Sequence, residues 1–287
     1  MDRVSLGQEA GRTLPIVSGR VANIFASLHR EGRTALMPFV TAGHPTRDAT
    51  AAAIVGMHQA GAALVEVGIP FSDPIADGPV IAASMHRALQ DGVTPSAAFE
   101  MVAAARARTE GGIIAMVSWS IVSRIGPATF LSQAAKSGID GVILPDIDTA
   151  DAGSVAEHCD RLQLALGLLV APGSSDMRVR EIVRHCRQFV YLLARAGLTG
   201  ERDTAPQIEA SVARIRTHTN LPIAAGFGIS SASHVSAVTA HADGAIVGSA
   251  LVRRMESAVD PVAAAVSFTR ELAVGLAQHP PKSATHR

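Results

Sequence analysis

The stretch Leu64–Pro79, LVEVGIPFSDPIADGP, predicts a buried strand followed by a stiff acidic loop. Its β-branched apolar start predicts the strand Leu64–Ile69, and a carboxylate, Glu66, lies inside that strand. Burying an ionised group costs several kcal/mol unless the group is paired or used. Three prolines then stiffen a loop that carries Asp73 and Asp77. A buried acid beside such a loop suits acid–base catalysis; the alternative is a satisfied core glutamate with two turn-capping aspartates.

The composition is that of a globular protein with a large core. Of the 287 residues, 48% are hydrophobic and 17% are charged. The 25 basic and 25 acidic residues cancel, so no overall charge attracts nucleic acid or an anionic membrane. Aromatic residues make up only 3% of the chain, which leaves little for base stacking. Any anion must therefore be bound by a local site.

Cysteine usage and the terminal sequences indicate a cytoplasmic chain without a metal. Cys159 and Cys186 lie in predicted helices, and no Cys or His pair has the spacing of metal ligands, so we expect free thiols. No uncharged apolar run is long enough for a transmembrane helix. Residues 1–20 lack the apolar core of a signal peptide and are expected to be a flexible extension, and residues 279–287 a loose tail.

Short apolar runs alternate with longer amphipathic segments between these extensions. The expected strands are Ala35–Thr41, Leu64–Ile69, Ile113–Val117, Gly141–Leu144, Ala165–Val170, Phe189–Ala194, Pro222–Ala225 and Gly244–Val247. The expected helices are Ile24–Arg30, Arg47–Ala60, Val80–Gln90, Pro95–Arg108, Pro127–Ser137, Ala150–Arg161, Asp176–Arg187, Gln207–Thr217, Ser231–Ala240 and, capped by Asp260, Pro261–Leu276.

Eight strands, each followed by a helix, predict an α/β fold: a single (β/α)8 TIM barrel over residues 21–278 with an extra N-terminal helix. A doubly wound open sheet is the alternative, and it usually has a glycine fingerprint after its first strand. The residues after the first strand here, Thr41–Pro45, are TAGHP, which is no such fingerprint. No linker or break in composition interrupts the chain, so we expect one domain.

Glycine-rich loops follow the last three predicted strands. They are Ala194–Gly200 (ARAGLTG), Ala225–Ser230 (AGFGIS) and Val247–Ala250 (VGSA). One such glycine alone is more often a turn residue, but glycines also let backbone N–H groups approach an anion. The active site of a barrel lies at the carboxyl ends of its strands, and the last two loops commonly hold phosphate there. Three adjacent glycine loops therefore predict a phosphate site.

Five motifs together resemble the tryptophan synthase α subunit family, in the family's order and spacing. They are PFVTAGHP at residues 38–45, EVGIPFSDPIADGP at 66–79, YLLARAGLTG at 191–200, GFGIS at 226–230 and GSA at 248–250. The likeness runs from about Ile24 to about Leu276. It implies a TIM barrel that acts in tryptophan biosynthesis. It also implies retro-aldol cleavage of indole-3-glycerol phosphate to indole and glyceraldehyde 3-phosphate, without a cofactor.

The resemblance also implies roles for individual residues. Glu66 and Asp77 match the catalytic acids. The chemistry requires protonation of indole C3 and removal of a hydroxyl proton, which suits Glu66, and a hydrogen bond from the indole N–H, which suits Asp77. The other matching positions are Phe39 and Tyr191 near the indole, Thr199 in a closing loop, Gly200, Phe227, Gly228, Gly248 and Ser249 around the phosphate, and Asp146 near the subunit interface.

Two loops depart from the family pattern. Ser118 and Ser120 stand where a tyrosine and an asparagine are expected, with Trp119 between them, and Asp148 stands where a proline is expected. Trp119 either stacks on the indole or packs under a neighbouring loop. In the family these loops face the β subunit as well as the substrate. The changes therefore put partner binding in doubt more than chemistry.

Three functions follow from these motifs. The first is a tryptophan synthase α subunit that hands indole to a β subunit in an α2β2-type complex. The second is a free-standing lyase with the same chemistry, which releases indole for secondary metabolism. The third is an inactive barrel that activates a partner, and the presence of both Glu66 and Asp77 argues against it.

Overall fold

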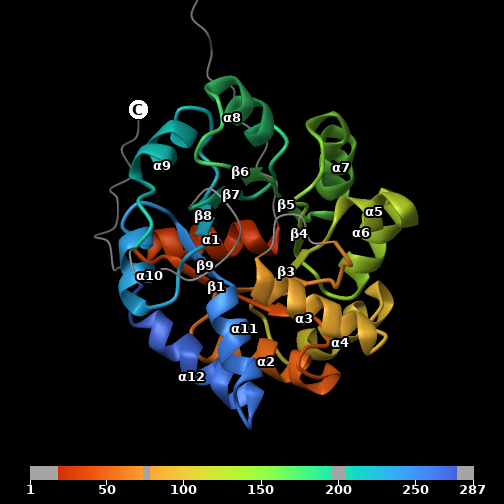
Figure 1. The fold of residues 1–287 in the computed structure, drawn as a ribbon. Helices are drawn as coiled ribbons and strands as arrows, with labels where there is room; N and C mark the ends of the chain where they lie inside the picture. Colours follow the sequence, from red (N-terminus) through yellow and green to blue (C-terminus); the bar gives the residue numbers. More distant parts are fainter. Residues whose placement is uncertain (1–18, 74–77, 195–204, 277–287) are drawn as a thin grey trace, which may run out of the picture.

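The computed structural model describes residues 19–73, 78–194 and 205–276 (Figure 1). Its strands are β1 (Ala35–Thr41), β2 (Leu64–Gly68), β3 (Gly112–Met116), β4 (Gly141–Ile143), β5 (Ala165–Gly167), β6 (Leu169–Val170), β7 (Val190–Leu193), β8 (Ile223–Gly226) and β9 (Gly244–Val247). Its helices are α1 (Arg20–Arg30), α2 (Arg47–Gln59), α3 (Pro79–Gln90), α4 (Pro95–Arg106), α5 (Trp119–Ile125), α6 (Pro127–Lys136), α7 (Thr149–Leu162), α8 (Asp176–Val183), α9 (Glu209–Arg216), α10 (Ala232–Thr239), α11 (Ser249–Glu256) and α12 (Pro261–Ala273).

The strands form a parallel barrel with the helices around it, as Figure 1 shows. Their order is β5-β4-β3-β2-β1-β9-β8-β7-β6, and every adjacent pair is parallel. The TIM-barrel prediction is therefore confirmed. Among the described residues, no helix is long and apolar enough to cross a membrane. Of the expected terminal extensions, residues 1–18 and 277–287 lie outside the described part of the chain.

The predicted fifth strand, Ala165–Val170, is divided in two. Its first half pairs with β4 and its second half with β7, so the barrel closes through this segment. Gly167 ends the first half and faces the barrel interior, where a Cβ would lie only 2.5 Å from Cζ of Phe189. The Tyr191 amide donates to the carbonyl of Leu168, between the two halves, at 3.2 Å. The division arises from closure, which no local pattern predicts.

The other differences concern helix ends and short helices. Helix α8 ends at Val183 instead of Arg187, because Arg187 forms an antiparallel bridge with Leu166. Helices α5 and α11, which follow β3 and β9 directly, were not predicted. The predicted cap of the last helix is confirmed, since the Asp260 carboxylate accepts from the Ala263 amide at 2.9 Å.

Alternation along the strands divides the core into two layers. The outer layer lies between strands and helices and includes Val65 and Val67 of β2. The inner layer fills the barrel and includes Leu64 of β2. Helix α1 closes the lower, amino-terminal end, because its Phe25 joins the inner layer and stacks on Phe189 with ring centroids 6.4 Å apart. Side chains therefore fill the barrel, and the carboxyl end that α1 leaves uncovered is the end at which barrel enzymes have their active sites.

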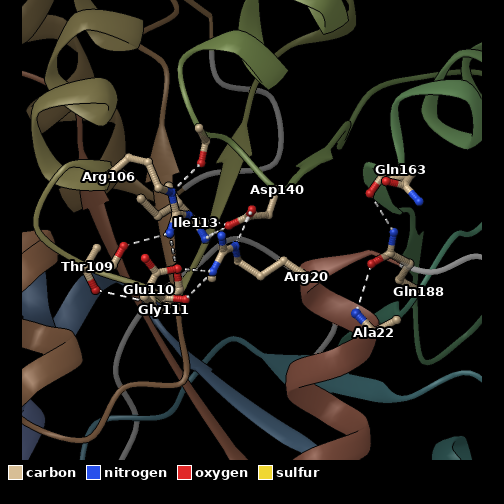
Figure 2. Close-up of polar contacts among 12 residues, drawn as sticks. Arg20, Ala22, Arg106, Thr109, Glu110, Gly111, Ile113, Asp140, Gln163 and Gln188 are labelled. Carbon is tan, nitrogen blue, oxygen red and sulfur yellow. Dashed lines mark hydrogen bonds and ion pairs between the residues drawn. The ribbon is translucent and has the colours of Figure 1, made fainter.

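Polar contacts fix α1 at both sides of that lower end, as Figure 2 shows. Arg20 forms ion pairs with Glu110 at 2.6 Å and with Asp140 at 3.2 Å. The Gln188 amide accepts from Ala22 N–H at 2.9 Å and donates to a backbone carbonyl, that of Gln163, at 3.0 Å. These contacts extend α1 to Arg20, four residues before its predicted start.

A half-buried neutral histidine joins α2 to the start of β3 and to the loop before it. Nδ1 of His58 lies 2.8 Å from Oγ1 of Thr109, and Nε2 lies 3.2 Å from the carbonyl oxygen of Gly112. Burial lowers the pKa of His58 from 6.5 to about 4. A neutral ring that donates from Nε2 and accepts at Nδ1 satisfies both contacts.

We expect His58 to make the fold acid-sensitive. Between about pH 6.5 and pH 4 the unfolded chain binds a proton that the folded chain does not, so the free energy of unfolding falls as pH falls through that window. By about pH 5 the loss from this one group is about 2 kcal/mol. Urea unfolding of His58→Gln should show a shallower pH dependence than the unsubstituted chain. The exposed His86→Gln is the control, and an equally steep dependence in His58→Gln would contradict the assignment.

Candidate functional site

Glu66 lies inside the barrel, in the middle of β2. The register places it between Phe39 of β1 and Ile114 of β3. Its neighbours Val65 and Val67 face the outer layer, so alternation turns Glu66 to the interior. Only 1% of the residue is exposed. The structure therefore places the predicted acid among apolar side chains, where a carboxylate is costly unless it is used or partnered.

One wall of the barrel mouth is built on Phe39. A Cβ on Gly68 would lie 2.5 Å from Cζ of Phe39, so the ring occupies space that only glycine leaves. Two side chains of α3, Ile81 and Met85, join the same inner layer. The sequence prediction missed both. An apolar pair four residues apart on a helix after the acidic loop was the available signal.

The opposite wall contains Tyr191 and Phe227. Their rings pack edge to face with centroids 6.4 Å apart. A Cβ on Gly226 would lie 2.5 Å from the Tyr191 hydroxyl, so this ring also packs over a glycine. Phe227 has φ +84° and Gly228 has φ +78°. A left-handed phenylalanine is strained, and such strain is typical of functional loops.

The amino-terminal end of α11 lies beside Phe39. Gly248 is the N-cap and Ser249 the first helical residue, 8% exposed. The first N–H groups of a helix have no partner within it and carry the positive end of its dipole. A Cβ on Gly248 would lie 3.2 Å from Cδ1 of Ile81 and 3.9 Å from Cβ of Phe39. Helix amino-terminal ends of this kind can bind an anion without a cationic side chain.

Asp146 ties together the two loops that depart from the family pattern. Its carboxylate accepts from the Ser118 hydroxyl at 2.6 Å and from the Trp119 amide at 2.7 Å. The Ser118 and Ser120 hydroxyls lie 2.9 Å apart. Trp119 is partly buried against the outer layer, which is the packing alternative rather than the stacking one. The Asp148 side chain caps α7 by accepting a hydrogen bond from the backbone amide of Ala150.

The remaining predicted residues are placed as follows. Asp77, Thr199 and Gly200 lie outside the described residues, and Asp73 is described and exposed. In the described part of the chain, no group of three or more His, Cys, Asp or Glu side chains could hold a metal ion. Cys159 and Cys186 are buried thiols, and burial raises the pKa of each to about 12.

Comparisons with known proteins agree with this geometry. The family description "Tryptophan synthase alpha chain" matches residues 25–279. The tryptophan synthase alpha chain of Synechococcus sp. (strain CC9902) is 42% identical over 84% of this chain and 90% of the relative. That of Chloroflexus aggregans is 38% identical over 88% and 96%.

Solved structures give the same result. A Mycobacterium tuberculosis tryptophan synthase chain superposes with a TM-score of 0.83 at 31% identity, covering 90% of this chain and 98% of that one. The tryptophan synthase subunit alpha of Legionella pneumophila str. Paris gives 0.83 at 29% identity with the same coverage. The chain therefore belongs to the tryptophan synthase alpha chain family, whose members are lyases that cleave indole-3-glycerol phosphate in tryptophan biosynthesis.

Proposed function

We propose that Glu66 is the acid–base group with which this barrel cleaves indole-3-glycerol phosphate to indole and glyceraldehyde 3-phosphate in the cytoplasm. The observation that carries the proposal is a carboxylate only 1% exposed inside the barrel, paired in register with Phe39 and Ile114. Desolvation strengthens electrostatic interactions there, and a positioned acid or base contributes about 10²–10⁴-fold to a rate.

The proposed reaction adds a proton to a carbon, removes a proton from a hydroxyl and breaks one carbon–carbon bond. Indole C3 is protonated, which places positive charge on the indole ring. The glycerol hydroxyl next to the bond then loses its proton as the bond breaks, and its oxygen becomes the aldehyde of glyceraldehyde 3-phosphate. Glu66 shuttles these protons. Asp77 accepts a hydrogen bond from the indole N–H and stabilises the cationic ring.

The two walls of the mouth suit the two ends of this substrate. Phe39 and Tyr191 present rings to the indole. The loop at Phe227 and Gly228 and the start of α11 at Ser249 present backbone N–H groups to the phosphate. Gly248 and Gly200 let the backbone approach that group, and Thr199 orders Asp77. Binding the phosphate end positions the reacting carbon, since energy from a remote group lowers the barrier at the reacting centre.

We expect Glu66→Gln to lower kcat by about 10²–10⁴-fold while the fold is retained, because the amide keeps the shape and loses the exchangeable proton. Steady-state release of free indole measures kcat, and circular dichroism measures folding. The matched control is Glu100→Gln on the exposed face of α4, which should keep full kcat. A Glu66→Gln enzyme with unreduced kcat would refute the mechanism.

We expect Gly228→Ala to raise KM about tenfold with a smaller effect on kcat, because it perturbs the phosphate end and not the reacting carbon. Gly92→Ala is the matched control, since Gly92 also has a left-handed φ, +69°, but lies after α3 and away from the proposed phosphate site. Both variants carry similar backbone strain. Equal KM values in the two would argue against phosphate binding at this loop.

We propose that the physiological partner is a tryptophan synthase β subunit. The relatives in this family are named as chains of tryptophan synthase, which supports such a partner. One observation favours the second candidate, a free-standing lyase: Asp146 engages Ser118 and Trp119 within the chain and ties the two departing loops together. The inactive-barrel candidate is disfavoured by the placement of Glu66.

We expect the isolated chain to release indole slowly and to be strongly accelerated by a β subunit. The loops after β3 and β4 would then be completed by the partner. The measurement is kcat for indole release by the purified chain, alone and with a tryptophan synthase β subunit. Fast turnover alone that the β subunit leaves unchanged would instead establish the free-standing lyase.

A further inference from the structure

A large pocket lies at the lower end of the barrel, away from Glu66. Its volume is about 1190 Å³, which is ample for a small organic molecule. Its lining includes α1 and the residues that lead into β7, β8 and β9, among them Gln188, Pro222 and Asp243. Because these residues precede their strands, the pocket is at the amino ends, whereas the proposed catalytic mouth is at the carboxyl ends. Nothing in the proposed reaction uses it.

The floor of this lower pocket is apolar. Phe25 and Leu28 come from α1, and Val183 and Cys186 come from the end of α8 and the turn after it. All four are buried residues of the two core layers. A ligand seated here would therefore cover apolar surface of the core itself.

The rim of the lower pocket is strongly cationic. Six arginines and two aspartates line it, which leaves an excess of four positive charges; they are Arg30, Arg33, Arg180, Arg184, Arg187 and Arg216, with Asp160 and Asp243. Arg187 pairs with Asp160 at 2.7 Å, Arg216 pairs with Asp243, and Arg33 pairs with Glu31 at 2.9 Å. The other three arginines have no carboxylate within ion-pair distance among the residues that the structure describes.

Helix dipoles explain part of this charge but not its arrangement. Arg30 and Arg180 lie in the last turns of α1 and α8, where a cation is favoured in any helix. Arg124 and Arg270 lie in the last turns of α5 and α12 and line no part of this pocket. The dipole effect is the same in all four helices. In the lower pocket, such arginines lie around an apolar floor.

We propose that the lower pocket binds a small organic anion with an apolar body. The body would pack on Phe25 and Leu28, and the acidic group would be held by the unpaired arginines of α1 and α8. Concave apolar surface favours a small molecule over a flat protein partner. The lining holds more arginines than aspartates, and three of those arginines have no ion pair among the described residues, which favours an acid over a neutral molecule.

The test is a fluorescence titration of the full chain with anilinonaphthalene sulfonate, an aromatic anion. We expect saturable binding that weakens with added salt, as an ionic contact requires. The double variant Arg30→Gln/Arg180→Gln should raise Kd by about tenfold or more. The control Arg124→Gln/Arg270→Gln removes the same charge from two other helix ends and should leave Kd unchanged. Equal Kd values in the two double variants would overturn the proposal.

Competition and hydrogen exchange identify the ligand class and the place of binding. Naphthoate and naphthyl phosphate should displace the dye, and whichever is stronger distinguishes a carboxylate from a phosphate ester. Naphthol, with the same body and no anionic group, should displace it poorly; equal displacement would overturn the role of charge. Ligand binding should increase the hydrogen-exchange protection of the backbone amides of α1 and of residues 180–188. Protection confined to the barrel mouth, or a dimer that Arg30→Gln/Arg180→Gln dissociates, would also overturn the proposal.

Discussion

The interior of this barrel depends on aromatic rings packed over inward glycines. Phe39 fills the space above Gly68, and Tyr191 fills the space above Gly226, each so closely that a Cβ would lie 2.5 Å from the aromatic side chain. Close packing of this kind tolerates neither added methyl groups nor voids. The rings thus build the walls of a mouth in which Glu66 is held at 1% exposure. The residues that pack the barrel interior are therefore also those of the proposed site.

The two ends of the barrel have different tasks because α1 covers one of them. Phe25 extends the inner layer below Phe189, and ion pairs from Arg20 hold the helix across the ends of β3 and β4. Interior side chains at that end therefore serve stability. At the other end Glu66 lies within β2, beneath the loops that follow the strands, and this is the end at which barrel enzymes carry their chemistry.

Local patterns in the sequence predict most of this fold. The bounds of β1, Ala35–Thr41, are those predicted, and Glu66 is recognisable as an acid within an apolar run. The division at Gly167 was not predictable, because it follows from barrel closure and from the ring of a distant residue. The bond between Ser118 and Asp146 joins two loops 28 residues apart in sequence, so no single window contains it. Short helices such as α5 carry too few turns for periodicity to reveal.

Local sequence patterns do not predict the lower pocket either. Three of its arginines, Arg30, Arg180 and Arg216, lie in the last turn of a helix, where a basic residue is common in any sequence. What matters is that α1, α8 and α9 end around one apolar floor, which only the closed barrel determines. Phe25 belongs to that floor and stacks on Phe189, and Phe189 lies on the same strand face as Tyr191 at the mouth. The two ends are therefore joined by packed side chains, and a ligand at one can affect the other only by moving that packing.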